Sequence, residues 1–162
     1  MNLNVEQGDL TASSADTLIV NLFEGVTNPG GATGAVDRAL DGAISNLIAG
    51  GDFSGKAGEV AVLYPRGAIN ARRVLIAGLG KHNDFDLEGI RQAAATAVKR
   101  ARELKANHVA TIVHGAGIAG LPVADAAQAT VEGTLLALHR YPAVKQTEED
   151  AHDIETLSVV DF

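Results

Sequence analysis

The chain contains no cysteine and no tryptophan, and its 162 residues include only four phenylalanines and two tyrosines. The lack of cysteine excludes a disulfide framework and thiolate chemistry. So few aromatic side chains leave little material for stacking on nucleic-acid bases. No apolar run approaches the roughly 18 residues that would span a bilayer, and residues 1–6 lack the basic and apolar regions of a secretory signal. These absences predict a soluble, cytoplasmic protein without a membrane partner.

Positive charge is also scarce, because 13 Lys and Arg stand against 20 Asp and Glu and give a net charge of −7. Such a balance repels phosphate backbones, so nucleic acid is an unfavoured partner. Acidic residues concentrate in the segment 146–155. We therefore predict one domain over residues 1–145, followed by an acidic linker and a terminal strand over 146–162.

Apolar residues make up 46% of the chain and fall into strand-length runs separated by helical patterns. Strands are predicted at 3–5, 17–23, 60–64, 73–77 and 109–113, with a sixth at 156–161 that either joins the sheet edge or leads toward a following domain. Helices are predicted at 33–48, capped by Thr33, from Asp86 to about 104, and from Pro122 to about 139.

Long apolar strands alternating with amphipathic helices are typical of a sheet that is covered on both faces. The predicted fold is therefore α/β, a three-layer α/β/α domain with a mixed central sheet. Its predicted core comprises Val20, Leu40, Ile44, Ile76, Ile90, Val98 and Val113.

The polar residues match no known catalytic or metal-binding pattern. The five histidines are scattered at positions 82, 108, 114, 139 and 152 without a metal-ligand spacing. The serines lack the flanking glycines that expose an esterase nucleophile. We therefore predict no catalytic residue and no metal site, although His114 beside Gly115 could line a pocket.

A glycine-rich loop at 115–122 (GAGIAGLP) joins a predicted strand to a predicted helix and matches G-x-G-x-x-G. Backbone amides in such a loop can cradle a pyrophosphate. A Rossmann-type site would also place an acidic residue about 20 positions later, and none lies near Arg140.

The same loop resembles the phosphate loop of macro domains, the modules that bind ADP-ribose. Residues 8–11 (GDLT) and 15–21 (ADTLIVN) look like the opening of that fold, in which the first Asp contacts adenine. The resemblance implies a candidate nucleotide pocket built from Asp9, Asn21, Gly31, Gly34, Gly115, Gly117 and Gly120. Glu24 departs from the macro pattern, and a carboxylate there would repel a diphosphate. We therefore expect ADP-ribose to bind weakly or not at all.

Residues 51–59 (GDFSGKAGE) and 72–81 (RRVLIAGLGK) resemble the N-terminal domain of cytosolic leucyl aminopeptidases, which itself has a macro-like fold. This resemblance covers roughly residues 15–145. It implies a non-catalytic domain, because the family carries its divalent metal pair, Zn or Mn, and its catalytic residues in a second, C-terminal domain.

The family resemblance also implies partners, namely that C-terminal catalytic domain and the other subunits of a homo-oligomer. The leading hypothesis is a domain for oligomer contacts and active-site access, which is not an enzyme by itself. The alternative is an ADP-ribose or nucleotide-binding macro domain, with de-ADP-ribosylation as its enzymatic extension.

Overall fold

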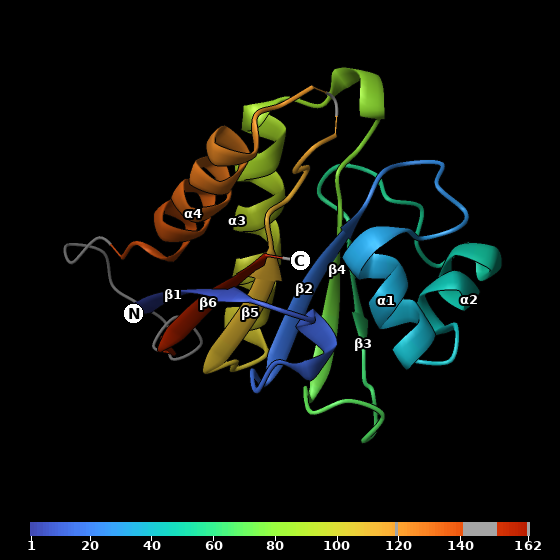
Figure 1. Ribbon diagram of the computed structural model, residues 1–162, viewed down its shortest axis with the longest axis horizontal. Coiled ribbons are helices and arrows are strands. Elements are labelled where there is room, and N and C mark those ends of the chain that lie inside the picture. The colour runs from blue at the N-terminus through green and yellow to red at the C-terminus, as the bar shows by residue number, and fades with distance from the viewer. Residues whose placement is uncertain (119, 141–151, 162) are drawn as a thin grey trace.

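The computed structural model describes residues 1–118, 120–140 and 152–161. A six-stranded sheet with the order β1-β6-β5-β2-β4-β3 forms its centre (Figure 1). All neighbouring strands are parallel except β3 and β4, so the sheet is mixed, as predicted. The strands are β1 (Asn2–Gln7), β2 (Thr17–Leu22), β3 (Val60–Leu63), β4 (Arg73–Gly78), β5 (His108–Ile112) and β6 (Thr156–Asp161).

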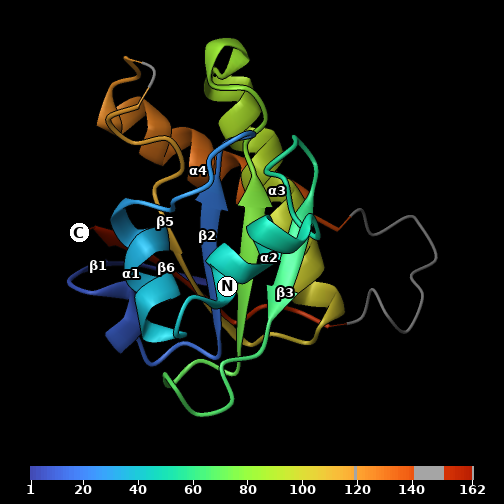
Figure 2. The same ribbon diagram turned by 90° about the vertical axis from the view of Figure 1, so that its right-hand side faces the viewer.

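Helices cover both faces of this sheet, which confirms the three-layer architecture. Helices α1 (Gly31–Ala39) and α2 (Ala43–Gly50) lie in front of the sheet in Figure 2, whereas α3 (Leu87–Glu103) and α4 (Val123–Leu138) lie behind it. Successive strand residues point to opposite faces. In β2, Leu18 and Val20 accordingly join the core under α1 and α2, and Ile19 joins the core under α3 and α4.

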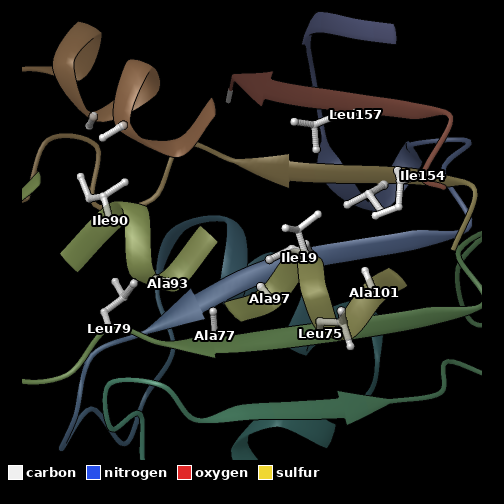
Figure 3. Packing of buried hydrophobic residues seen from close by; sticks show 14 of the residues in the cluster. Ile19, Leu75, Ala77, Leu79, Ile90, Ala93, Ala97, Ala101, Ile154 and Leu157 are labelled. Atoms are coloured by element: carbon white, nitrogen blue, oxygen red, sulfur yellow. The ribbon is translucent and has the colours of Figure 1, made fainter. Parts of the chain in front are cut away.

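Small side chains let α3 lie close to the sheet and to α4. Figure 3 shows Ala93, Ala97 and Ala101 of α3 beside Ile19 and Leu75 of the neighbouring strands β2 and β4, in one buried cluster. The predicted cap of α3 is confirmed, because the Asp86 carboxylate accepts a hydrogen bond of 2.8 Å from the Gly89 amide. The predicted start of α4 after Pro122 is also confirmed.

The single helix predicted over 33–48 is wrong, because the chain breaks it into α1 and α2. Asp41 and Gly42 adopt left-handed backbone angles, with φ of 54° and 79°. Asp37 explains the new start: its Oδ1 accepts from the amides of Ile44 (2.8 Å) and Ser45 (3.0 Å). A carboxylate at these free amides also complements the helix dipole, which stabilises the start of a second helix at Ala43.

Thr33 is not the helix cap that the sequence predicted. Gly30 holds the cap position of α1 and offers no side chain. The Thr33 hydroxyl instead donates a 2.7 Å hydrogen bond to the carbonyl of Asn21. Thr33 thereby ties the first turn of α1 to the end of β2.

The sixth strand lies inside the sheet between β1 and β5, not at its edge. The predicted domain boundary after residue 145 lies outside the described residues and stays a prediction. Of the seven predicted core residues, five are buried, whereas Leu40 and Val113 are only partly buried and pack against the two cores.

Candidate functional site

The connections around β2 and β5 open a crevice at their carboxyl ends. These neighbouring parallel strands lead into helices on opposite faces of the sheet, since α1 follows β2 and α4 follows β5. Ligands in α/β folds bind at such a switch point because the two departing connections leave space between them. A pocket of about 430 Å³ lies here, lined in part by Asn21, Ile112 and Val160.

Backbone amides and apolar side chains form the walls of this pocket. Gly31, Ala32 and Thr33 begin α1 and line one side, while Gly115 and Ala116 line the pocket from the loop after β5. The first turn of a helix leaves its amides without helical acceptors, and Gly30 brings no side chain to cap them. The pocket can therefore donate hydrogen bonds to an anion, and the dipole of α1 adds to that preference.

His114 is not among the pocket-lining residues, but it holds the side chain of Asn21, which lines the pocket. Its ring is 1% exposed, and its Nδ1 lies 3.0 Å from the Asn21 side-chain nitrogen. Burial lowers the pKa of His114 to about 4, so the ring is neutral near pH 7. Nδ1 then accepts from the Asn21 amide, and the proton on Nε2 faces the Thr111 hydroxyl at 3.4 Å. This arrangement leaves the Asn21 Oδ1 available to a ligand.

The structure brings together only part of the predicted nucleotide site. Asn21, Gly31 and Gly115 line the pocket. Gly117 and Gly120 are exposed in the following loop, and both adopt a left-handed φ of 69°.

Gly34 and Asp9 have structural roles outside the pocket. A Cβ at Gly34 would lie 2.5 Å from the Pro29 carbonyl oxygen, so this glycine lets α1 approach the preceding loop. Asp9 caps a short 3-10 helix (Leu10–Ala12) by accepting from the Thr11 amide at 2.8 Å. A nucleotide role for these residues stays a prediction.

Glu24 was expected to repel a ligand in this pocket, but it is not among the residues that line it. Glu24 lines a separate hollow of about 430 Å³ together with Lys81, Asp84 and Asp86. Two further polar residues line the pocket, Thr33 and Asp161, and neither was predicted as a site residue. Asp161 is the last residue of β6. It reaches the pocket because β6 lies inside the sheet, next to β5.

No group of three or more His, Cys, Asp or Glu residues gathers to hold a metal ion within residues 1–118, 120–140 and 152–161. The family resemblance places its divalent metal pair in a second domain, and that expectation stays a prediction. In the same described part of the chain, no helix combines the length and apolar character needed to cross a membrane.

Comparison with known proteins decides the family. Residues 5–148 match the model described as "Cytosol aminopeptidase family, N-terminal domain". The chain belongs to this family. As a cytosol aminopeptidase N-terminal domain, it is 34% identical over 162 residues to a probable cytosol aminopeptidase of Roseiflexus castenholzii, covering 99% of this chain and 30% of the relative. A relative from Alkaliphilus oremlandii is 30% identical over 151 residues, with 93% and 30% covered. The chain thus spans about 30% of the length of these relatives.

Solved structures show the same fold at low sequence identity. A tomato leucine aminopeptidase aligns with a TM-score of 0.75 and 19% identity over 99% of this domain and 32% of that chain. A Trypanosoma brucei macrodomain in complex with ADP aligns with a TM-score of 0.77 and 17% identity, over 99% and 64%. These likenesses confirm the predicted macro-domain-like fold.

Proposed function

We propose that this domain is the non-catalytic N-terminal part of a cytoplasmic aminopeptidase, and that it serves oligomer contacts and access to an active site elsewhere in the enzyme. Family membership supports this proposal, as does the 30% share of the relatives' length. The proposed parent enzyme releases N-terminal amino acids from peptides, and a second domain holds its Zn or Mn pair. The described residues of this chain offer no comparable ligand cluster.

One exposed apolar face carries the proposal. We define the apolar face as Met1, Leu3, Val5, Leu135 and Leu136. Val5 is 81% exposed and Leu136 is 72% exposed. Met1 of the N-terminus and Leu135 of α4 line the same hollow of about 700 Å³. Large exposed apolar patches mark interaction sites, and we propose that these five side chains form one.

A domain exchange tests this function. We expect that the Roseiflexus relative, with its matching segment replaced by this chain, assembles and releases leucine from leucyl substrates. Leu136→Lys in the exchanged domain should reduce the assembled fraction at least about tenfold, because it places a charge in the buried interface. Analytical ultracentrifugation and leucine release measure both effects.

Tyr64→Lys is the matched control, because Tyr64 is also exposed but follows β3 at the other edge of the sheet. The isolated chain should release no leucine with added zinc or manganese. Metal-dependent turnover by the pure chain, or equal assembly of both lysine variants, would contradict the proposal.

A second candidate function is the binding of ADP-ribose or a related nucleotide, and the uncapped start of α1 in the pocket favours it. The macrodomain in complex with ADP has the same fold. The described pocket residues include no Lys or Arg, however, and they include Asp161. Affinity for a diphosphate must then come from backbone amides alone.

We expect calorimetry with ADP-ribose to show a dissociation constant weaker than about 1 μM, which corresponds to about −8 kcal/mol. Ala32→Asp should abolish any binding in the pocket, because the carboxylate would occupy the free amides of α1. Ala35→Asp, one turn later in the same helix, is the control. Micromolar or tighter binding that only Ala32→Asp removes would place this candidate ahead of the first.

A further inference from the structure

Strand β1 leaves one side of its backbone without a partner strand among the described residues, because it lies at the sheet edge beside β6. The Asn2 amide donates to the Glu155 carbonyl at 2.7 Å, and the Gly8 amide donates to the Asp161 carbonyl at 3.0 Å. Backbone groups alternate in direction along a strand. The even-numbered residues of β1 therefore point their amides toward β6, and Leu3, Val5 and Gln7 point theirs outward.

This edge lacks the features that usually protect an edge strand. Natural proteins use short strands, proline or lysine to prevent unwanted pairing. The opposite edge strand, β3, has four residues and is followed by Pro65 after one intervening residue. In contrast, β1 has six residues without proline, lysine or arginine. Its open side is suited to pair with another strand.

We propose that β1 pairs antiparallel with β1 of a second copy of this chain, about a two-fold axis that passes beside Asn4. The inference rests on the proposed function, since it names the partner and the contact for part of the apolar face. Leu3 and Val5 of one copy would exchange backbone hydrogen bonds with Val5 and Leu3 of the other. Two six-stranded sheets would then form one continuous sheet.

The side-chain pattern of β1 is complementary to itself in this register. Leu3 stands opposite Val5 of the second copy, so apolar side chains meet on one face. Glu6 stands opposite Asn2, so no two like charges are opposed. Glu6 is also held within its own chain, because the Ser158 hydroxyl donates to its carboxylate at 2.6 Å. This self-complementarity favours a second copy over a strand of unrelated sequence.

The apolar face would be covered by the same pairing. Leu3 is in register with Leu157, which packs in the core under α3 and α4. Leu3 and Val5 therefore point to the side of the sheet that carries α4. A two-fold axis perpendicular to the sheet places α4 of both copies on this same side. The Leu135 and Leu136 side chains of the two copies would then flank one shared apolar interface.

An introduced cysteine tests the pairing and its register, because the chain has no cysteine of its own. In the proposed register, Asn4 faces Asn4 of the second copy as a non-hydrogen-bonded pair, with Cα atoms about 4.5 Å apart. That separation permits a disulfide. We expect Asn4→Cys to form a disulfide-linked dimer at least about tenfold faster than Tyr64→Cys, whose residue lies at the opposite edge.

A second measurement uses the chain without cysteine. Light scattering after gel filtration should give twice the 16.7 kDa chain mass at high concentration for the native sequence, and the monomer mass for Val5→Lys. Val5 is 81% exposed, so this substitution should leave the fold intact. Circular dichroism checks that the variant is folded.

Two outcomes would overturn the strand pairing. The first is a native chain that stays monomeric while Asn4→Cys cross-links no faster than Tyr64→Cys. The second is a dimer that persists in Val5→Lys but is lost in Leu136→Lys, which would leave the proposed oligomer function standing with a different contact. Failure of the domain exchange, with strand pairing intact, would instead refute the proposed function alone.

Discussion

Gly78→Ala should destabilise the domain by at least about 3 kcal/mol, at the upper end of what overpacking a core usually costs. A Cβ at this position would lie 2.0 Å from the carbonyl oxygen of Lys56 and 2.8 Å from the carbonyl carbon of Gly55. Neither side can move easily. The Gly78 amide donates to the Glu59 carbonyl at 2.8 Å, and the Gly80 amide donates to the Gly55 carbonyl at 2.9 Å. The end of β4 and the 51–59 turn are therefore held together by their backbones.

Urea unfolding measures this loss as a shift of the midpoint at constant slope. Gly30→Ala is the matched control, since a Cβ there meets no heavy atom within 4 Å and the residue has a φ of −112°. The control should change the free energy of unfolding by less than about 1 kcal/mol. Equal stability of the two variants would show that the turn is not fixed against β4.

The same contact shows what the sequence could and could not predict. Three glycines between 51 and 59 predicted a turn, and the apolar run at 73–77 predicted a strand. Both predictions are right. Nothing in either pattern says that Gly78 and the turn touch, because the contact joins segments that are distant along the chain. Periodicity reports which face of an element is apolar, but it does not report which backbone lies against it.

The single helix predicted over 33–48 and the position predicted for the strand at 156–161 were wrong for related reasons. The apolar spacing over 33–48 fits one helix, but the Asp37 carboxylate competes by capping α2. Strand β6 has the composition of any buried strand, and its place between β1 and β5 depends on pairings that only the folded chain forms. Because Asp161 ends that strand, its arrival at the pocket could not be foreseen.

The sequence predicted the candidate site from its glycine-rich loops together with the resemblance to macro domains. Asn21 lies near the end of β2, Gly31 begins α1 and Gly115 lies in the loop after β5. The carboxyl ends of parallel strands meet at one edge of the sheet, which brings these residues together. Gly117 and Gly120 belong to the same motif but do not line the pocket. Both have a positive φ, and the motif alone does not fix the direction in which such a loop turns. The partnership between His114 and Asn21 joins residues 93 positions apart, so no local pattern reveals it.

Because His114 is buried, we predict that the stability of the domain depends strongly on pH. The free energy of unfolding should fall as the pH is lowered from 6.5 to about 4. Burial lowers the pKa of His114 from 6.5 to about 4, so below pH 6.5 the unfolded chain takes up a proton that the folded domain refuses. The loss reaches about 1.4 kcal/mol per pH unit inside this window, and on the order of 3 kcal/mol in total. Above pH 6.5 this contribution is fully retained.

His114→Gln isolates the effect, because glutamine can accept from the Asn21 amide but does not titrate. Urea unfolding of both proteins between pH 4 and 8 should give a steep pH dependence for the native domain and a flatter one for the variant. The carboxyls of Asp16 and Glu59 also have lowered pKa values, because burial, which raises each, is outweighed by hydrogen bonds. The stability that these two carboxyls contribute is lost as the pH falls below their usual pKa values of 3.8 and 4.5. This loss is the same in the native domain and in the variant. Parallel curves for the two proteins across pH 6.5 to 4 would mean that folding does not lower the pKa of His114. The buried neutral ring that accepts from the Asn21 amide would then be wrong.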